Sequence, residues 1–389
     1  MIDRTLSRII INDAGKMPVV TIMGPRQSGK TTLVKHSFPQ HQYINLEDSE
    51  WRQLMEIDPK GVLADPEGHW IIDEVQRLPT LLATIQVLVD QRKVPGKFIL
   101  TGSQNILLKS SVAQSLAGRT AIRYLLPLSY SELYPNHTGL KPSAQYIHSG
   151  FYPALYDGDV PAHDWLSWYI QTYIERDVQA LILNRNWQKF NTFLRLCAGR
   201  AGQLINSTNL ANETGIDYKT IQSWLDILEL SFIIYRLYPY HENYNKRIIK
   251  TPKLYFYDTG LLSYLLGLHQ IEDIRLHYQY GQLFENLVLG EFKKQLYHNG
   301  FRESISFWRS RSGMEIDILL GSGEKQAAFE IKSTATYKNT LTKNLRKWQE
   351  ITQNPGSPLT LIYDGELDEG IGGLRIMNWR KINLAEAYS

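Results

Sequence analysis

The chain has 389 residues, enough for two or three domains with cores of their own. Its net charge of +3 is too small to indicate nucleic-acid binding by itself, and no run of 18 uncharged apolar residues predicts a membrane span. The single cysteine, Cys197, excludes an intramolecular disulfide and a thiolate zinc cluster. The first residues contain an early acid and no apolar signal segment, so we expect a cytoplasmic enzyme with no membrane partner.

The first informative segment is residues 24–31, which match the phosphate-binding pattern G-x-x-x-x-G-K-[ST] at every fixed position. Residues 19–23 predict a short buried strand, and residues 31–35 predict the opening of a helix. A strand, a glycine turn and a helix N-terminus form an anion site, because unpaired backbone N–H groups converge there. The segment therefore predicts binding of a nucleoside triphosphate.

Each position of this loop has an expected task. Glycine at 24 and 29 is expected to allow positive φ and close approach of the backbone to phosphate. Lys30 is expected to reach the β- and γ-phosphates, and the Thr31 hydroxyl to ligate Mg²⁺. The predicted nucleotide-binding residues are Gly24, Pro25, Arg26, Gln27, Ser28, Gly29, Lys30, Thr31 and Thr32.

An apolar strand ending in two acids follows at residues 69–74. A carboxylate at the end of a parallel strand can hold the shell of a Mg²⁺ ion, and the next one can polarise the attacking water. Asp73 is therefore the candidate metal-shell ligand and Glu74 the candidate base.

A third strand, residues 97–101, ends in a turn of polar residues. A polar side chain there would lie beside the acid-bearing strand, where it senses the γ-phosphate or orients water. We choose Ser103 over Thr101 and Asn105, and the alternative is an ordinary turn at a strand end.

These stretches resemble a known family. The segments GPRQSGKTT, WIIDEVQRLP, FILTGSQNILL and SLAGRT are similar to the AAA+-type ATP-binding proteins of bacteria and archaea. Those proteins carry a C-terminal domain of uncharacterised function. The likeness continues through YIERDVQALI, PKLYFYDTGLL, GQLFENLV, FWRSRSGMEIDILL and FEIKS, so it spans nearly the whole chain. The resemblance implies ATP and Mg²⁺ as cofactors and ATP hydrolysis as the reaction.

Two arginines are candidates for stabilising charge on the transferred phosphoryl group, namely Arg119 and Arg176. The resemblance favours Arg119, whereas Arg176 lies between two acids and equally suits an ordinary ion pair on a helix surface. If either acts on a neighbouring subunit's nucleotide, the protein must be a homo-oligomer.

The overall prediction is an α/β protein with four parts. Residues 1–135 alternate strands with helices, as a P-loop three-layer ATPase domain does, and residues 136–198 predict a helical lid. Residues 199–250 are expected to form a winged helix, and residues 251–389 an α/β domain resembling the restriction endonucleases.

The winged-helix prediction rests on two short helices and a strand. Ser207 is expected to cap the first helix, Gly215 to make the turn, and Asp217 to cap the second. The second helix, residues 218–229, has a buried stripe and an opposite face that can meet phosphates or base edges. The loop 241–247 would be the wing. Such modules bind double-stranded DNA, but they also serve as lids or protein contacts.

The C-terminal part brings together acids and a lysine. Ile316, Ile318 and Leu320 are expected to share one face of a strand, so that Asp317 points to the other. On the next strand Glu330 and Lys332 share a face, and helical Glu285 adds a fourth group.

That ordered set, Glu285, Asp317, Glu330 and Lys332, resembles the PD-(D/E)xK nuclease superfamily. The resemblance implies that the acids hold Mg²⁺ and that Lys332 orients or activates a water that attacks a phosphodiester. The alternative is a surface ion pair, or a relic that holds the hairpin together. Two functions therefore compete: an ATPase coupled to DNA binding or processing, and a regulatory NTPase whose C-terminal domains bind proteins.

Overall fold

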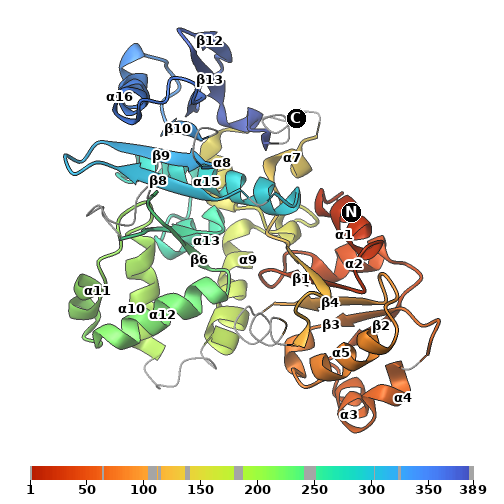
Figure 1. Cartoon of the computed structure of the whole chain (residues 1–389). Helices are drawn as coiled ribbons and strands as arrows, with labels where there is room; N and C mark the ends of the chain where they lie inside the picture. The colour runs from red at the N-terminus through yellow and green to blue at the C-terminus, as the bar shows by residue number, and fades with distance from the viewer. Residues whose placement is uncertain are drawn as a thin grey trace.

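Figure 1 shows the computed structural model of the chain, with one sheet in the N-terminal region and a second large sheet in the C-terminal region. A mainly helical region, yellow-green to green, lies to the left of the N-terminal sheet and below the C-terminal one in this view. The structure describes residues 2–63, 65–103, 112, 115–135, 141–178, 187–240, 251–301, 303–322 and 326–384, without the side chains of 175–178. Asn105, the predicted wing 241–247 and the Arg176 side chain lie outside these described parts.

The N-terminal sheet is parallel throughout, with the strand order β2-β3-β4-β1-β5. Strand β4 lies between the phosphate-loop strand β1 and the acid-bearing strand β3. The carboxyl ends of these three strands therefore meet at one edge, which is where parallel sheets bind ligands. The strands are β1 (Val19–Met23), β2 (Gln42–Asn45), β3 (Trp70–Asp73), β4 (Phe98–Gly102) and β5 (Thr120–Tyr124).

Helices cover both faces of this sheet, because every residue of β1, β3 and β4 is buried and needs apolar cover. One apolar cluster joins α1 and α2 to Val20 and Ile22 of β1. A larger cluster joins α3, α4 and α5 to Val19 and Met23 on the other face. The predicted three-layer α/β arrangement is confirmed. The helices are α1 (Leu6–Ala14), α2 (Lys30–Ser37), α3 (Ser49–Ile57), α4 (Pro59–Leu63), the 3-10 turn η1 (Val75–Arg77) and α5 (Leu81–Gln91).

The region that we predicted as a lid, residues 136–198, is mainly helical where the structure describes it. It includes one π-helical segment, η3, whose Tyr173 ring lies 5.8 Å from the guanidinium carbon of Arg26 in the phosphate loop. This part of the chain therefore reaches the loop. Helix α7 (Tyr130–Leu133) precedes this region, and the elements within it are α8 (Ser143–Ser149), η2 (Pro153–Leu155), α9 (Ala162–Tyr169), η3 (Ile170–Val178) and α10 (Trp187–Ala198).

Two helices and a two-stranded antiparallel sheet follow: α11 (Ser207–Thr214), α12 (Tyr218–Leu230), β6 (Ile234–Leu237) and β7 (Lys253–Phe256). Asp217 caps α12 as predicted, but α11 is capped by Asn206 rather than Ser207, because the Asn206 side chain accepts from the Asn209 N–H. Strand β7 pairs with β6, so the boundary that we placed at residue 250 falls between two paired strands.

The C-terminal sheet is mixed, with the order β12-β13-β11-β10-β9-β8. Strands β8, β9 and β10 are antiparallel neighbours, whereas β10, β11 and β13 run parallel. The elements are α13 (Thr259–Leu265), α14 (Ile271–Leu276), α15 (Tyr280–His298), β8 (Ile305–Arg309), β9 (Glu315–Leu320), β10 (Ala327–Lys332), η6 (Asn339–Thr342), α16 (Lys343–Thr352), β11 (Leu359–Tyr363), β12 (Glu369–Ile371), β13 (Leu374–Asn378) and η7 (Trp379–Lys381).

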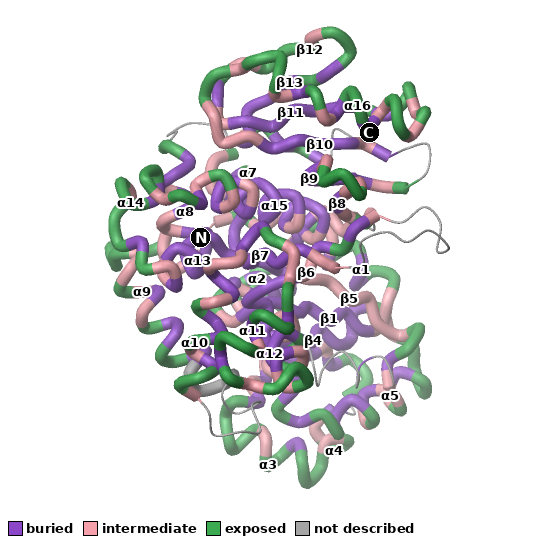
Figure 2. The backbone as a smooth tube through the Cα atoms, turned by 90° about the vertical axis from the view of Figure 1, so that its left-hand side faces the viewer, coloured by how far each residue is buried: buried purple, intermediate pink, exposed green. Residues whose placement is uncertain are grey.

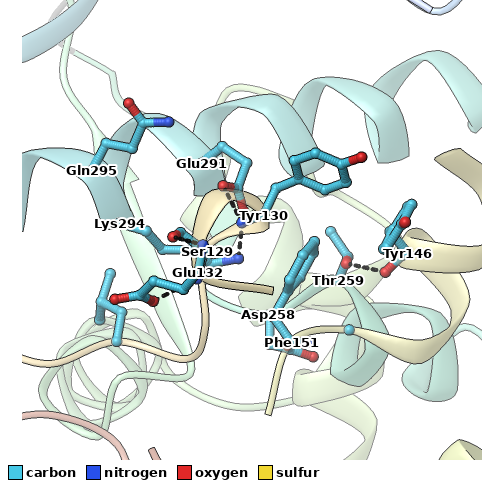
Figure 3. A network of polar contacts seen from close by, with 12 residues as sticks. Ser129, Tyr130, Glu132, Tyr146, Phe151, Asp258, Thr259, Glu291, Lys294 and Gln295 are labelled. Carbon is cyan, nitrogen blue, oxygen red and sulfur yellow. Dashed lines mark hydrogen bonds and ion pairs between the residues drawn. The ribbon is translucent and has the colours of Figure 1, made fainter. Parts of the chain in front are cut away.

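Helix α15 is the central element of the molecule and is buried along most of its length (Figure 2). Its polar side chains meet the N-terminal domain in the network of Figure 3. Glu291 Oε2 accepts from the Tyr130 N–H over 2.8 Å, and Lys294 Nζ donates to Glu291 Oε1 over 2.8 Å. Glu132 accepts from the Ser129 N–H and lies 3.3 Å from His298 Nδ1. The buried charges of this junction are thus paired, as burial requires.

Candidate functional site

The phosphate loop leaves β1 and enters α2 through two glycines that serve different purposes. Gly29 has φ +91°, so a side chain there would be strained. Gly24 has no positive φ, but a Cβ at this position would lie 2.1 Å from the Leu125 carbonyl oxygen. Our prediction of positive φ therefore holds for Gly29 and is wrong for Gly24, where the neighbouring backbone excludes a side chain.

Lys30 folds back over its own loop. Its Nζ donates to the Gly24 carbonyl over 3.0 Å and to the Pro25 carbonyl over 2.7 Å. Burial lowers the pKa of Lys30 to about 8, although the nearby Glu74 and Asp73 act in the opposite direction. The carbonyl oxygens hold the ammonium at the place where the motif expects phosphate oxygens.

Asp73 gathers hydroxyl groups from three elements. Its Oδ2 accepts from Thr31 Oγ1 over 2.7 Å and from the Tyr43 hydroxyl over 2.7 Å, and its Oδ1 accepts from Thr101 Oγ1. The structure thus brings the predicted metal-binding pair, Thr31 and Asp73, into contact. Tyr43 was missed in the sequence, where nothing but its place in the short strand β2 indicates a role.

Glu74 adopts a left-handed conformation with φ 56° directly after β3. Ser103 Oγ donates to Glu74 Oε2 over 2.8 Å, and Gln76 Nε2 donates to Ser103 Oγ over 3.1 Å and also to Glu74. We chose Ser103 as a group that senses phosphate or orients water, and the structure places it against the carboxylate of Glu74. Gln76, on the turn after β3, was missed.

The donor set around Asp73 and Glu74 fits a divalent cation. In the described parts of the chain, no lysine or arginine nitrogen lies within 4.0 Å of either carboxylate. Neighbouring carboxylates repel each other unless a cation lies between them, and Mg²⁺ prefers oxygen ligands. Thr31, Asp73 and a bound triphosphate would supply only oxygens.

Two residues of the predicted nucleotide-binding loop, Gly29 and Thr32, line a small cavity of about 110 Å³. Arg4, which we missed, closes one side of it, because its Nη1 donates to the Ser28 carbonyl over 2.8 Å. Thr32 lines the same cavity from α2. The full lining is Ile2, Arg4, Gly29, Thr32, Leu33, Leu128, Pro153 and Asp157.

Arg119 lies at the wrong end of the sheet to reach its own phosphate loop. Its carbonyl accepts from the Val19 N–H at the start of β1, whereas the loop begins after Met23 at the end. The intervening strand is about 16 Å long at 3.3 Å per residue. The guanidinium makes two hydrogen bonds to Asp90 of α5, of 2.6 and 2.8 Å. A contact with the nucleotide of its own subunit is therefore ruled out.

In the C-terminal domain, a β-bulge changes the direction of Asp317. Ser306 pairs with Leu319 and Trp308 with Ile316, so two residues of β9 face one residue of β8. Consequently Ile316 packs in the cluster with α16, whereas Ile318 packs in the cluster with α15. Our prediction that Ile316 and Ile318 share one face is wrong, because bulges re-aim the side chains of a strand.

The bulge brings Asp317 to Glu285 of α15 and to Glu315 at the start of β9. Ligand oxygens of these three residues, here called the carboxylate trio, lie within 4.8 Å of one another. Lys253 of β7 joins them, with its Nζ 3.0 Å from Glu285 Oε1 and in contact with Glu315 Oε1. Burial raises the pKa of Glu285 to about 7, against the attraction of Lys253. The trio opens into a cavity of about 600 Å³ that Lys332 also lines.

Glu330 is not a member of this group, although we predicted it as a metal ligand. Its Oε1 accepts from Lys332 Nζ over 2.6 Å and lies 3.4 Å from Asn344 Nδ2 of α16. Burial and the charge of Asp317 raise the pKa of Glu330 to about 8. Glu315 takes the place we gave to Glu330, and Lys253 was missed, although its position in a strand of aromatic residues is unusual for a lysine.

The exposed side of α12 is not basic. With its cap the helix carries Asp217, Asp226 and Glu229 against Lys219 alone. Arg236 of β6 is bound by Asp226 over 2.7 Å and by Glu229. Positive charge for phosphate contacts is therefore scarce on the part of this surface that the structure describes.

Models of known protein families match three consecutive parts of the chain. Residues 16–134 match the model of an AAA domain, and residues 280–382 match a domain of unknown function, DUF4143. Residues 141–272 match another domain of unknown function, DUF8612. No helix in the described segments is long and apolar enough to cross a bilayer.

An uncharacterised protein of Mycobacterium tuberculosis is 29% identical over 361 residues, which are 90% of this chain and 77% of that protein. An uncharacterised protein of Haemophilus influenzae is 24% identical over 350 residues, covering 80% of this chain and 83% of that protein. Among solved structures, a Walker-type ATPase of Pyrococcus abyssi aligns with a TM-score of 0.41 and 17% identity, over 68% of this chain and 96% of that one. The matching domain models, together with the phosphate loop, identify the chain as an AAA+-type ATP-binding protein with a C-terminal domain of unknown function.

Proposed function

We propose that the protein is a Mg²⁺-dependent ATPase whose hydrolysis is coupled to DNA binding or processing by its C-terminal units. The observation that carries the ATPase part is the contact of Thr31 with Asp73, beside a Glu74 that Ser103 holds. An ATP-binding loop, a metal-shell carboxylate and an oriented base are the parts that phosphoryl transfer to water needs.

In the proposed reaction Lys30 exchanges the carbonyls of Gly24 and Pro25 for the β- and γ-phosphate oxygens. A Mg²⁺ ion held by Thr31 and the Asp73 shell would neutralise charge on the phosphates. Glu74 takes the proton of the attacking water, while Ser103 fixes the direction of its carboxylate.

The small cavity beside the loop suits the base of the nucleotide. Leu33, Leu128 and Pro153 give it apolar walls that can pack on a flat ring. Arg119, since it cannot serve its own subunit, is proposed for a neighbouring subunit's nucleotide, and this role requires a homo-oligomer.

Support for a role on DNA comes from two features. Three helices, α10 to α12, precede the β6–β7 sheet, which is the element order of a winged helix. The carboxylate trio with Lys332 beside it lies in a cavity, as a PD-(D/E)xK site would. A second function, a regulatory NTPase whose C-terminal domains bind proteins, is favoured by the acidic α12 and its paired Arg236.

Two variants test the ATPase. Lys30→Ala is expected to abolish or greatly weaken ATP binding, because the ammonium contacts ground-state phosphates. Glu74→Gln is expected to bind ATP as wild type does and to lose about 10²- to 10⁴-fold in turnover, as removal of a general base does. Equal turnover of wild type and Glu74→Gln, with binding measured in parallel, would place the base elsewhere.

Fluorescence anisotropy with labelled duplex DNA at two salt concentrations separates the two candidate functions. Binding through phosphates gives an affinity that falls steeply with salt, by about 0.9 log units per log unit of salt for each phosphate contact. Absence of binding at low salt, with and without ATP and Mg²⁺, would favour the regulatory NTPase.

A further inference from the structure

Lys253 reaches the carboxylate trio from outside the sheet that carries it. The lysine begins β7, which pairs with β6, whereas Glu315 and Asp317 belong to β9 and Glu285 to α15. Its side chain is only 4% exposed. A lysine is seldom buried to this extent unless its charge is paired. The Lys253 ammonium is therefore the buried counter-ion of the carboxylate trio.

The contacts of this ammonium use the oxygens that a metal ion would need. Lys253 Nζ lies 3.0 Å from Glu285 Oε1 and also contacts Glu315 Oε1, while Arg309 Nη1 lies 3.1 Å from Glu315 Oε2. A Mg²⁺ ion binds oxygen atoms at about 2.1 Å in octahedral geometry and keeps several water ligands, so it needs space around the carboxylate oxygens. The ammonium and a divalent cation therefore cannot occupy the trio together.

The balance of charge also differs from that of an ordinary metal site. Lys253 and Arg309 already offset two of the three carboxylates, so little negative charge remains to attract a cation. At the ATP site, by contrast, hydroxyl groups surround Asp73 and leave its charge in place.

Backbone hydrogen bonds determine where Lys253 lies. The Leu254 N–H donates to the Gln203 carbonyl over 3.0 Å, and the Tyr240 N–H, on the chain that continues β6, donates to the Phe307 carbonyl over 2.7 Å. Lys253 can leave the trio only if β7 shifts relative to β9, or if its side chain swings into the adjoining cavity. The first movement displaces the whole unit formed by α11, α12, β6 and β7, because β7 is paired with β6 in it.

We propose that Lys253 is an internal counter-ion that keeps divalent cations out of the carboxylate trio until the β6–β7 unit moves. This inference rests on the proposed function, in which the carboxylate trio binds a divalent cation once Lys253 has left it. The β6–β7 unit then controls the C-terminal site: a ligand that shifts this unit admits the cation, and the resting protein keeps the site closed.

The test uses Mn²⁺ alone as the probe, titrated calorimetrically into the full-length chain without nucleotide. Lys253→Met removes the charge and keeps the apolar stem, and Lys253→Gln is a second variant should the first fail to fold. Lys332→Met is the matched control, since it removes a lysine of the same cavity that is bonded to Glu330 instead. Each variant is repeated with Asp317→Asn, so that only Mn²⁺ bound at the trio is counted.

We expect Lys253→Met or Lys253→Gln to bind one additional Mn²⁺ at least ten-fold more tightly than wild type, with the gain lost on Asp317→Asn and absent in Lys332→Met. If wild type already binds Mn²⁺ at the trio as tightly as these variants, the blocking role is overturned and the cation site stands. If no protein binds Mn²⁺ in an Asp317-dependent manner, the trio is not a cation site, and the blocking role is overturned with it.

Discussion

The protein contains two carboxylate clusters that differ in what surrounds them. At the ATP site, Asp73 and Glu74 are held by the neutral hydroxyls of Thr31, Tyr43 and Ser103. In the C-terminal domain, the carboxylate trio is held by the cations of Lys253 and Arg309. Neutral donors orient a carboxylate without cancelling its charge, and the nearby ammonium of Lys30 donates to the Gly24 and Pro25 carbonyls instead of to a carboxylate. The second has its counter-charge built in.

This difference explains why counting acids is a poor guide to metal sites. The C-terminal cluster offers three carboxylates with closely spaced oxygens, so by a count of acids it is the richer of the two. The groups that complete each cluster decide its chemistry, because a buried charge needs either a partner or a shifted pKa.

The largest difference in stability between changes at the two clusters is expected for Glu285→Gln. Removing one member of a buried ion pair leaves Lys253 with a weaker set of partners and costs about 3 kcal/mol of unfolding free energy. Urea unfolding of the nucleotide-free protein measures this loss. The matched change at the other cluster, Glu74→Gln, is expected to cost less, because Lys30 keeps its hydrogen bonds to the Gly24 and Pro25 carbonyls and loses only a more distant charge. Equal losses at the two positions would contradict the comparison.

A smaller loss of stability is expected for Asp73→Asn, which should instead weaken the binding of Mg²⁺. The Thr31 and Tyr43 hydroxyls can rotate to meet an amide, so the metal-free protein keeps most of its stability. The affinity for Mg²⁺ with ATP is expected to fall about 10- to 100-fold, as for other groups that orient metal ligands. ATP titrations in Mg²⁺ and in EDTA measure the difference. A variant equally weakened in both media would show that Asp73 acts on the nucleotide and not on the metal.

The sequence predicted well where the candidate residues of the N-terminal domain lie, because local patterns determine their positions. Strand β1 has the predicted bounds, and Lys30, Thr31, Asp73 and Glu74 lie where a strand, a turn and a helix must place them. What it missed came from other parts of the chain. Arg4 reaches the loop from the N-terminal segment, and no local pattern reports a contact of that range.

The C-terminal cluster was predicted less well for a physical reason. A strict alternation of side chains places Ile316 and Ile318 together, and a single bulge opposite Phe307 breaks it. Lys253 depends on the packing of β7 against α15, which is tertiary information. The region that we predicted as a winged helix shows the intermediate case: the stripe and cap of α12 followed from the sequence, whereas the pairing of Asp226 with Arg236 did not.

The smallest and most pH-dependent effect is expected for Glu330→Gln. Burial and Asp317 raise the pKa of Glu330 from 4.5 to about 8, so the folded state binds this proton more tightly than the unfolded chain. A raised pKa favours folding fully below pH 4.5, and this contribution is lost as the pH rises through 8. Glutamine keeps a neutral side chain at every pH, so the variant should match wild type near pH 5 and exceed its melting temperature near pH 9. Lys332 attracts the charged form over 2.6 Å, and if that attraction were the stronger influence the variant would instead lose stability at high pH. Melting curves at both pH values decide whether burial or the ion pair dominates at the edge of the C-terminal cluster.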